Sequence, residues 1–99
     1  MQHTEIREIF EAYFEKYKKT EGDRSSWSAV WLESSPNGTL ELNMTKCPAG
    51  TTFKIFVNRT KITEVIGWDA FFPAMNMVAE KHPGLYDAEK LFTDMKFVI

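Results

Sequence analysis

The sequence has little of several features that define specialised classes of protein. Cys47 is its only cysteine, so no disulfide can form within the chain. With 43% hydrophobic residues and only 5 Gly and 4 Pro among 99 residues, the composition is that of a folded chain and not of a disordered or collagen-like one. No apolar run approaches the roughly 20 residues that span a bilayer, and polar residues follow Met1 where a signal peptide would be apolar. These absences predict one compact domain, residues 1–99, in the cytoplasm.

The sequence also lacks a large excess of charge of one sign and any catalytic motif. The 12 Lys and Arg against 14 Asp and Glu give a net charge of −2, which attracts no polyanion across the whole surface. The sequence has no glycine-rich phosphate loop, no Cys-x-x-Cys pattern and no signature of a nucleophile around Cys47. We therefore predict no cofactor, no metal ion and no catalytic residue, and we do not expect an enzyme.

Hydrophobic residues recur with the period of a helix near the start of the chain. The glutamates and lysines of this segment fall on the opposite arc. The pattern predicts an amphipathic helix over residues 5–20, capped by Thr4 and ended by Gly22, with its glutamates facing water. The expected buried residues are Ile6, Ile9, Phe10, Tyr13, Phe14 and Tyr17.

From Ser26 onward the hydrophobic period becomes two, which indicates strands. The segment Ser35-Pro36-Asn37-Gly38 has the residues of a type I turn followed by a bulged glycine, and such a loop would place Ser35 opposite Thr39. This register predicts a core-facing set of Val30, Leu32, Leu40, Leu42 and Met44. It sends Trp27, Ala29, Trp31 and Glu33 to the other face.

Residues 51–57 and 61–66 predict a second hairpin around Asn58-Arg59-Thr60. Opposite charges are matched when Lys54 lies opposite Glu64. This pairing places Phe53, Ile55, Thr63 and Val65 on one face and Phe56, Ile62 and Ile66 on the other. Both faces of the sheet are then partly apolar, so the second face needs a cover: the C-terminal third, a second subunit or a target.

The last third predicts one helix and a short final element. Asp69 would cap a helix with Pro73 near its start and Pro83-Gly84 after its end, buried along Phe71, Met75, Val78 and Ala79. Asp87 would cap a short helix, whereas residues 95–99 alternate as a strand does. The predicted fold class is therefore α+β: an N-terminal helix, a four-stranded antiparallel sheet from two hairpins, and a C-terminal helix followed by a short helix or strand.

Two functional alternatives have some support in the sequence. A pocket between sheet and helices with Asp69, His82 or Cys47 would suit a small ligand-binding or enzymatic domain, although their spacing matches no known motif. The order of elements resembles the double-stranded RNA-binding domain, with Lys46, Lys54, Arg59 and Lys61 in the sheet region. That family has lysines at the start of its last helix, where residues 67–73 here have Asp69 among aromatics, so we expect no such binding through this helix. Binding of single-stranded nucleic acid by stacking of bases on Trp27 or Trp31 stays an alternative.

The strongest functional signal is the number of aromatic residues: 3 Trp, 3 Tyr and 8 Phe. Aromatic and methionine side chains often anchor protein interfaces. We predict a non-enzymatic protein-interaction module that binds a protein partner or a second copy of itself, without nucleic acid, membrane or metal. Its small size is typical of inhibitors and adaptors, such as those that phages use against host defences. The predicted contact residues are Trp27, Trp31, Phe56, Trp68, Phe72 and Met77.

Overall fold

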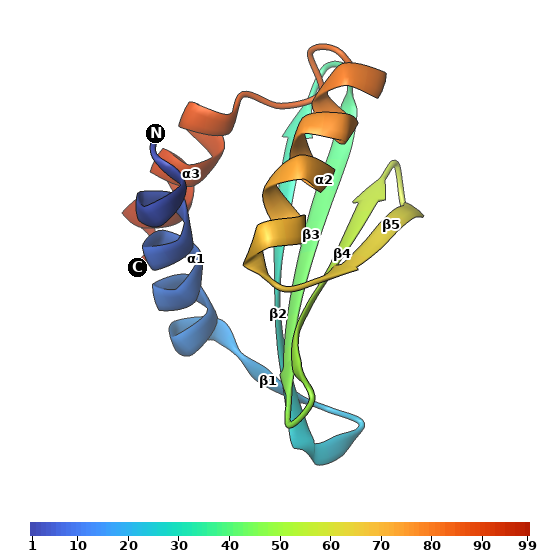
Figure 1. Cartoon of the computed structure of the whole chain (residues 1–99). Coiled ribbons are helices and arrows are strands. Elements are labelled where there is room, and N and C mark those ends of the chain that lie inside the picture. The colour runs from blue at the N-terminus through green and yellow to red at the C-terminus, as the bar shows by residue number, and fades with distance from the viewer.

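One helix, five strands and two further helices follow one another along the chain (Figure 1). The structure is a computed structural model of residues 1–99 that describes all side chains except those of Glu21, Asp23 and Arg24. The elements are α1 (His3–Tyr17), β1 (Lys19–Glu21), β2 (Asp23–Ser35), β3 (Gly38–Cys47), β4 (Gly50–Val57), β5 (Thr60–Ile66), α2 (Trp68–Lys81) and α3 (Ala88–Phe97).

The five strands form one antiparallel sheet in the order β1-β2-β3-β4-β5. This confirms the predicted α+β class and both predicted hairpins. The additional strand, β1, has only three residues, which is too short for a period-two pattern to reveal.

Helix α1 buries the predicted residues Ile6, Ile9, Phe10, Tyr13 and Phe14. Its bounds differ from the prediction: Gln2 precedes the helix without a side-chain cap, and Lys18 is already extended. The helix ends early because Lys19 pairs with Ser28 in the sheet. The predicted burial of Tyr17 is wrong, since Tyr17 is 40% exposed.

The predicted register of the first hairpin is wrong by one residue. Ser35 pairs with Gly38, so the loop has two residues, and the Ser35 hydroxyl accepts a hydrogen bond from the Asn37 N–H at 3.1 Å. A shift of one residue moves every side chain of a strand to the other face of the sheet. Ala29 now lies opposite Met44 and Trp31 opposite Leu42 in the core, while Val30 and Leu32 are exposed.

The predicted pairing of Lys54 with Glu64 in the second hairpin is confirmed. The turn has two residues, Asn58 and Arg59, and both have positive φ, at 50° and 71°, as a type I′ turn requires. A bulge between Ile55 and Phe56 leaves Ile62 without a partner in the register. Ile62 was predicted to face away from the core. Because the bulge adds one residue to β5, the Ile62 side chain faces the core instead and packs against it.

The C-terminal third forms two helices. Gly67 precedes α2 without a side-chain cap, so the predicted cap at Asp69 is wrong, and Pro73 lies inside the helix. Ala74 is buried in place of Ala79, which is exposed. The predicted cap at Asp87 is confirmed, because its carboxylate accepts a hydrogen bond from the Lys90 N–H at 3.1 Å. Of the two predicted final elements, the helix is the one that forms.

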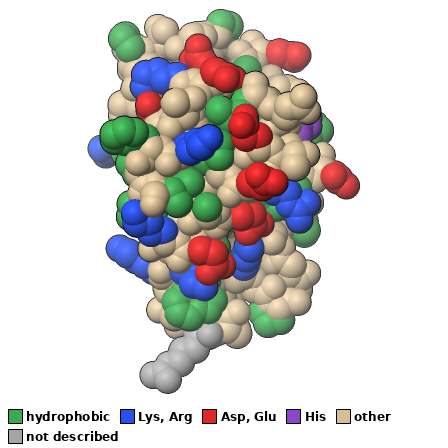
Figure 2. Space-filling view, turned by 90° about the vertical axis from the view of Figure 1, so that its left-hand side faces the viewer, with side chains coloured by type: hydrophobic (Ala, Val, Ile, Leu, Met, Phe, Trp, Pro, Cys, Tyr) green, Lys and Arg blue, Asp and Glu red, His purple; other side chains and the backbone are tan. Residues whose placement is uncertain are grey.

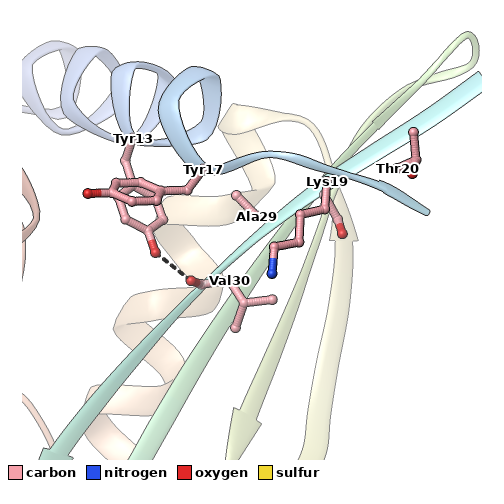
Figure 3. Close-up of a pocket in the computed structure, with 7 residues that line it drawn as sticks. Tyr13, Tyr17, Lys19, Thr20, Ala29 and Val30 are labelled. Carbon is pink, nitrogen blue, oxygen red and sulfur yellow. Dashed lines mark hydrogen bonds between the residues drawn. The ribbon is translucent and has the colours of Figure 1, made fainter.

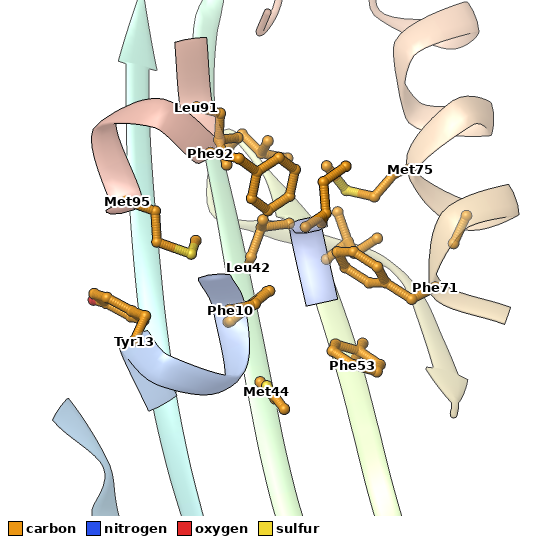
Figure 4. Packing of buried hydrophobic residues seen from close by; sticks show 14 of the residues in the cluster. Phe10, Tyr13, Leu42, Met44, Phe53, Phe71, Met75, Leu91, Phe92 and Met95 are labelled. Atoms are coloured by element: carbon orange, nitrogen blue, oxygen red, sulfur yellow. The ribbon is translucent and has the colours of Figure 1, made fainter. Parts of the chain in front are cut away.

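All three helices pack on the same face of the sheet. The buried cluster joins residues of α1, α2 and α3 to every second residue of β3 and β4, such as Leu42, Met44 and Phe53 (Figure 4). We call this side the core face and the opposite side the outer face. The outer face carries Val30, Leu32 and Phe56 between polar residues. No helix in the described part of the chain is long and apolar enough to cross a membrane.

Candidate functional site

Trp31, a predicted contact residue, lies on the core face and not on the outer face. Its ring packs edge-on against Tyr13 with 5.3 Å between centroids, and its indole N–H donates to Glu33 at 3.1 Å. The side chain is half-buried against the core. The prediction of Trp31 on the outer face is therefore wrong, for the same reason as the register.

Trp27 and Phe56 lie on opposite faces of the sheet. Trp27 has the orientation of Trp31, but it is 38% exposed near the end of β2, where the Lys18 ammonium is 5.3 Å from its ring centroid. The predicted outer-face position of Trp27 is thus also wrong. Phe56 is on the outer face as predicted, half-buried opposite Glu41.

The remaining predicted contact residues belong mainly to the helix layer. Trp68 is 8% exposed, and its indole N–H donates to Glu11 at 3.1 Å, so Glu11 does not simply face water as predicted. Phe72 is half-buried and stacks on His3 at 3.8 Å. Met77 packs against the core instead of projecting onto a polar arc. The six predicted residues therefore do not form one surface.

Part of the backbone edge of β2 has no neighbouring strand among the described residues. Strand β1 pairs with β2 only as far as Ser28. In an antiparallel ladder successive residues direct their N–H and C=O groups to opposite neighbours, and Trp31 and Glu33 direct theirs to β3. Val30, Leu32 and Ser34 therefore direct theirs away from the sheet. We call residues 30–34 the free β2 edge.

The polar groups of this edge are mostly unsatisfied within the described part of the chain. The Tyr13 hydroxyl donates to the Val30 carbonyl at 2.6 Å. Leu32 and Ser34 have no described hydrogen-bond partner on this side of the strand. Two side chains of this edge are also exposed to solvent, Val30 at 42% and Leu32 at 60%. The edge thus combines free backbone donors and acceptors with apolar side chains.

The opposite edge of the sheet, β5, has the usual protection against added strands. It carries the ion pair Lys61–Glu64 at 2.9 Å and the bulge at Ile62. Residues 29–35 of β2 contain no proline, lysine or bulge. The only charged side chain among them, Glu33, points inward, where it accepts from Trp31 and lies 3.7 Å from Lys90. The β5 edge is therefore protected against a further strand, whereas the β2 edge lacks this protection.

Two hollows flank the free β2 edge. The first, about 390 Å³, lies beside Val30 and is lined by Tyr13, Tyr17, Lys19, Thr20, Ser28 and Ala29 (Figure 3). The second, about 490 Å³, lies beside Ser34 between the hairpin and the segment before α3. A strand added along the edge would have space at both ends for its inward side chains.

The groups around the edge have defined charges near neutral pH. Burial raises the pKa of Tyr13, with a smaller contribution from Tyr17, so the hydroxyl remains a neutral donor to Val30. Hydrogen bonding to Asp94 and the charges of Asp94 and Glu33 raise the pKa of Lys90, which stays cationic.

Figure 2 views the side of the molecule where α1 and α3 lie. On this side basic and acidic side chains are interspersed with hydrophobic ones.

The residues considered for a ligand or catalytic pocket are not assembled into a site. Asp69 and His82 lie at opposite ends of α2, which separates them by about 20 Å along the helix. The Cys47 thiol donates to the Gly50 carbonyl at 3.5 Å within the turn between β3 and β4. No group of three or more His, Cys, Asp or Glu among the described residues could hold a metal ion.

No protein-family model, curated protein sequence or solved structure matches this chain. The function of the chain is therefore inferred from its geometry. The free β2 edge was not predicted because only the two faces of the sheet were considered for contacts. The available signal was the order of the strands: two successive hairpins leave the first strand at an edge, and the short β1 covers only part of it.

Proposed function

We propose that this chain is a non-enzymatic protein-interaction module that takes up an extended strand along the free β2 edge. The observation that carries the proposal is the row of unpaired backbone groups of Leu32 and Ser34, on an edge that has no proline or bulge and whose one charged side chain, Glu33, points inward. Unpaired strand edges bind extended segments through main-chain hydrogen bonds, and side-chain pockets add specificity. A small inhibitor or adaptor would use such an edge to occupy a strand of its target.

The side chains beside the edge divide the contacts of an added strand between two faces. On the outer face, Val30 and Leu32 would contact every second side chain of the added strand. On the core face, the hollow beside Tyr13 and Tyr17 would receive an apolar or aromatic side chain. Exposed polar backbone groups and exposed apolar side chains would thus become buried in the same step.

The proposal is tested by comparing two variants with the same change in chemistry. Leu32→Lys places a charge on the free β2 edge, and Ile66→Lys places it on the other edge strand, where Ile66 is 74% exposed. Peptides or proteins selected for binding to the wild-type chain should lose at least tenfold in affinity for Leu32→Lys and keep their affinity for Ile66→Lys. Equal affinity for wild type and Leu32→Lys, or equal loss in both variants, would contradict the proposal.

Salt dependence separates this function from nucleic-acid binding. Two cations of the sheet, Lys46 and Lys61, are paired with Glu11 and Glu64, so they are not available as an unopposed phosphate-binding set. We expect affinity to change less than about threefold between 50 and 200 mM salt, because phosphate contacts would cost orders of magnitude over this range. A binding titration at several salt concentrations measures it, and a steep decrease would favour nucleic acid.

A further inference from the structure

We infer that the strand which binds the free β2 edge is β2 of a second copy of this chain, paired antiparallel about a two-fold axis at Leu32. This inference rests on the proposed function, because it names the partner at the same edge. It would join two five-stranded sheets into one continuous sheet.

The free β2 edge is symmetric about Leu32. The residues with outward backbone groups are Val30, Leu32 and Ser34, so a two-fold axis at Leu32 pairs it with itself and pairs Val30 with Ser34 of the second copy. Hydrogen-bonded residues of an antiparallel ladder exchange both N–H to C=O bonds. Every outward N–H and C=O of residues 30–34 would then have a partner, including the Val30 carbonyl, which can accept a second bond beside that from Tyr13.

Charge does not oppose this self-pairing. On the outer face the two-fold axis places Leu32 of one copy beside Leu32 of the other, and none of Val30, Leu32 and Ser34 is charged. On the core face Trp31 comes opposite Glu33, so the two Glu33 carboxylates do not face each other. Glu33 is also already paired, with Trp31 at 3.1 Å and Lys90 at 3.7 Å. A chain of net charge −2 adds little overall repulsion.

The exposed apolar side chains concentrate on the same side of the molecule. Both α1 and α3 adjoin the edge, since Tyr13 bonds Val30 and Lys90 approaches Glu33. A hydrogen bond joins the C-terminal ends of these helices: the Tyr17 hydroxyl donates to the Val98 carbonyl at 2.8 Å. Most of the large exposed hydrophobic residues are here: Tyr17, Val30, Leu32, Phe97, Val98 and Ile99, with Phe97 90% exposed. These hydrophobic side chains, which lie among charged ones, add apolar contact area to a two-fold interface at this edge.

The test is the mass in solution of the full chain and of the same two lysine variants. In analytical ultracentrifugation from micromolar to millimolar concentration, the wild type and Ile66→Lys should shift from 11.5 kDa to twice that mass. Leu32→Lys should stay at the monomer mass over the whole range. A monomeric wild type at millimolar concentration, or a dimer that Leu32→Lys leaves intact, would overturn the inference.

The register is tested by a single cysteine. Residues in a hydrogen-bonded antiparallel pair have Cα atoms about 5.5 Å apart, which suits a disulfide. In a Cys47→Ser background, Leu32→Cys should form a disulfide-linked dimer on mild oxidation, whereas Ile66→Cys should not. Equal cross-linking at both positions would overturn the register. If the wild type is monomeric but a different protein binds it in a Leu32-dependent way, self-pairing fails and the proposed function stands.

Discussion

Tyr13 is the residue that joins helix α1 to the free β2 edge. Its hydroxyl donates to the Val30 carbonyl at 2.6 Å, and its ring packs on Trp31. Tyr86 makes a similar buried contact in the C-terminal third, where its hydroxyl donates to the Met75 carbonyl at 2.7 Å. In both cases burial is the main cause of a raised tyrosine pKa.

These two tyrosines predict a loss of stability at high pH. Because the pKa of each in the folded chain lies above the ordinary value of 10.0, the folded state keeps a proton that the unfolded state releases. The contribution of the two tyrosines to the free energy of unfolding is present below pH 10 and is lost as the pH rises through their folded-state pKa. Urea unfolding should show a smaller loss between about pH 9 and pH 11 for the Tyr13→Phe, Tyr86→Phe variant than for wild type.

The comparison with wild type isolates the two tyrosines, because all other titratable groups are the same in both chains. Each Phe substitution removes a hydrogen bond and should cost about 1 kcal/mol near pH 7. Parallel pH curves for wild type and the double variant would contradict the role assigned to the two hydroxyls.

Arg59 occupies a backbone conformation that disfavours any residue with a β-carbon. Its φ of 71° follows the φ of 50° at Asn58, in a turn where glycine is the common second residue. Asn58 is fixed by its side chain, whose oxygen accepts from the Thr39 N–H at 3.0 Å. Arg59→Gly should therefore raise the free energy of unfolding by about 0.5 to 1 kcal/mol, whereas Arg59→Ala should give no such gain. A loss of stability in Arg59→Gly, measured by urea unfolding, would contradict this.

At the scale of elements, β2 shows why hydrophobic pattern alone does not determine register. Its odd positions include Ala29 and Trp31 and its even positions Val30 and Leu32, so either set makes an apolar face against Leu42. The turn residues also suit loops of two or three residues. Packing against α1 selects the odd set, because Tyr13 needs both the Trp31 ring and the Val30 carbonyl. That information lies in a distant segment and not in the strand.

The second hairpin and the helices were predictable because their signals are local. Matching the opposite charges of Lys54 and Glu64 predicts the pairing of β4 with β5 that forms, and Asp87 has the right side chain and position to cap α3. The bulge at Ile62 has no such signal, since it depends on two non-glycine residues forming a turn with positive φ.

The alternation along β2 predicts opposite effects on stability for neighbouring residues. Trp31→Glu removes a half-buried ring and places a carboxylate near Glu33, so it should cost about 2 to 4 kcal/mol. Leu32→Lys changes an exposed side chain and should stay within about 0.5 kcal/mol of wild type. Chemical denaturation of both variants measures this difference. A stable Trp31→Glu chain with an unstable Leu32→Lys chain would restore the originally predicted register.

At the scale of the whole molecule, the three helices share one face and leave part of the sheet open. The sequence indicated that the sheet is apolar on both faces, and it left three possible covers for the second face. The structure places the C-terminal third beside α1 on the core face, so the chain does not cover Val30 and Leu32 itself. Which face a helix covers depends on the path of the chain, and the periodicity of that helix does not encode it.

Amide hydrogen exchange along β2, followed by NMR as the protein concentration increases, tests the central claim most directly. In the dilute chain the amides of Leu32 and Ser34 should exchange rapidly, whereas those of Trp31 and Glu33, which bond β3, should exchange slowly. In the concentrated chain all four should exchange slowly, because the free β2 edge is then paired. Uniformly slow exchange in the dilute chain would contradict the free β2 edge itself, and rapid exchange at Leu32 and Ser34 at every concentration would contradict its self-pairing.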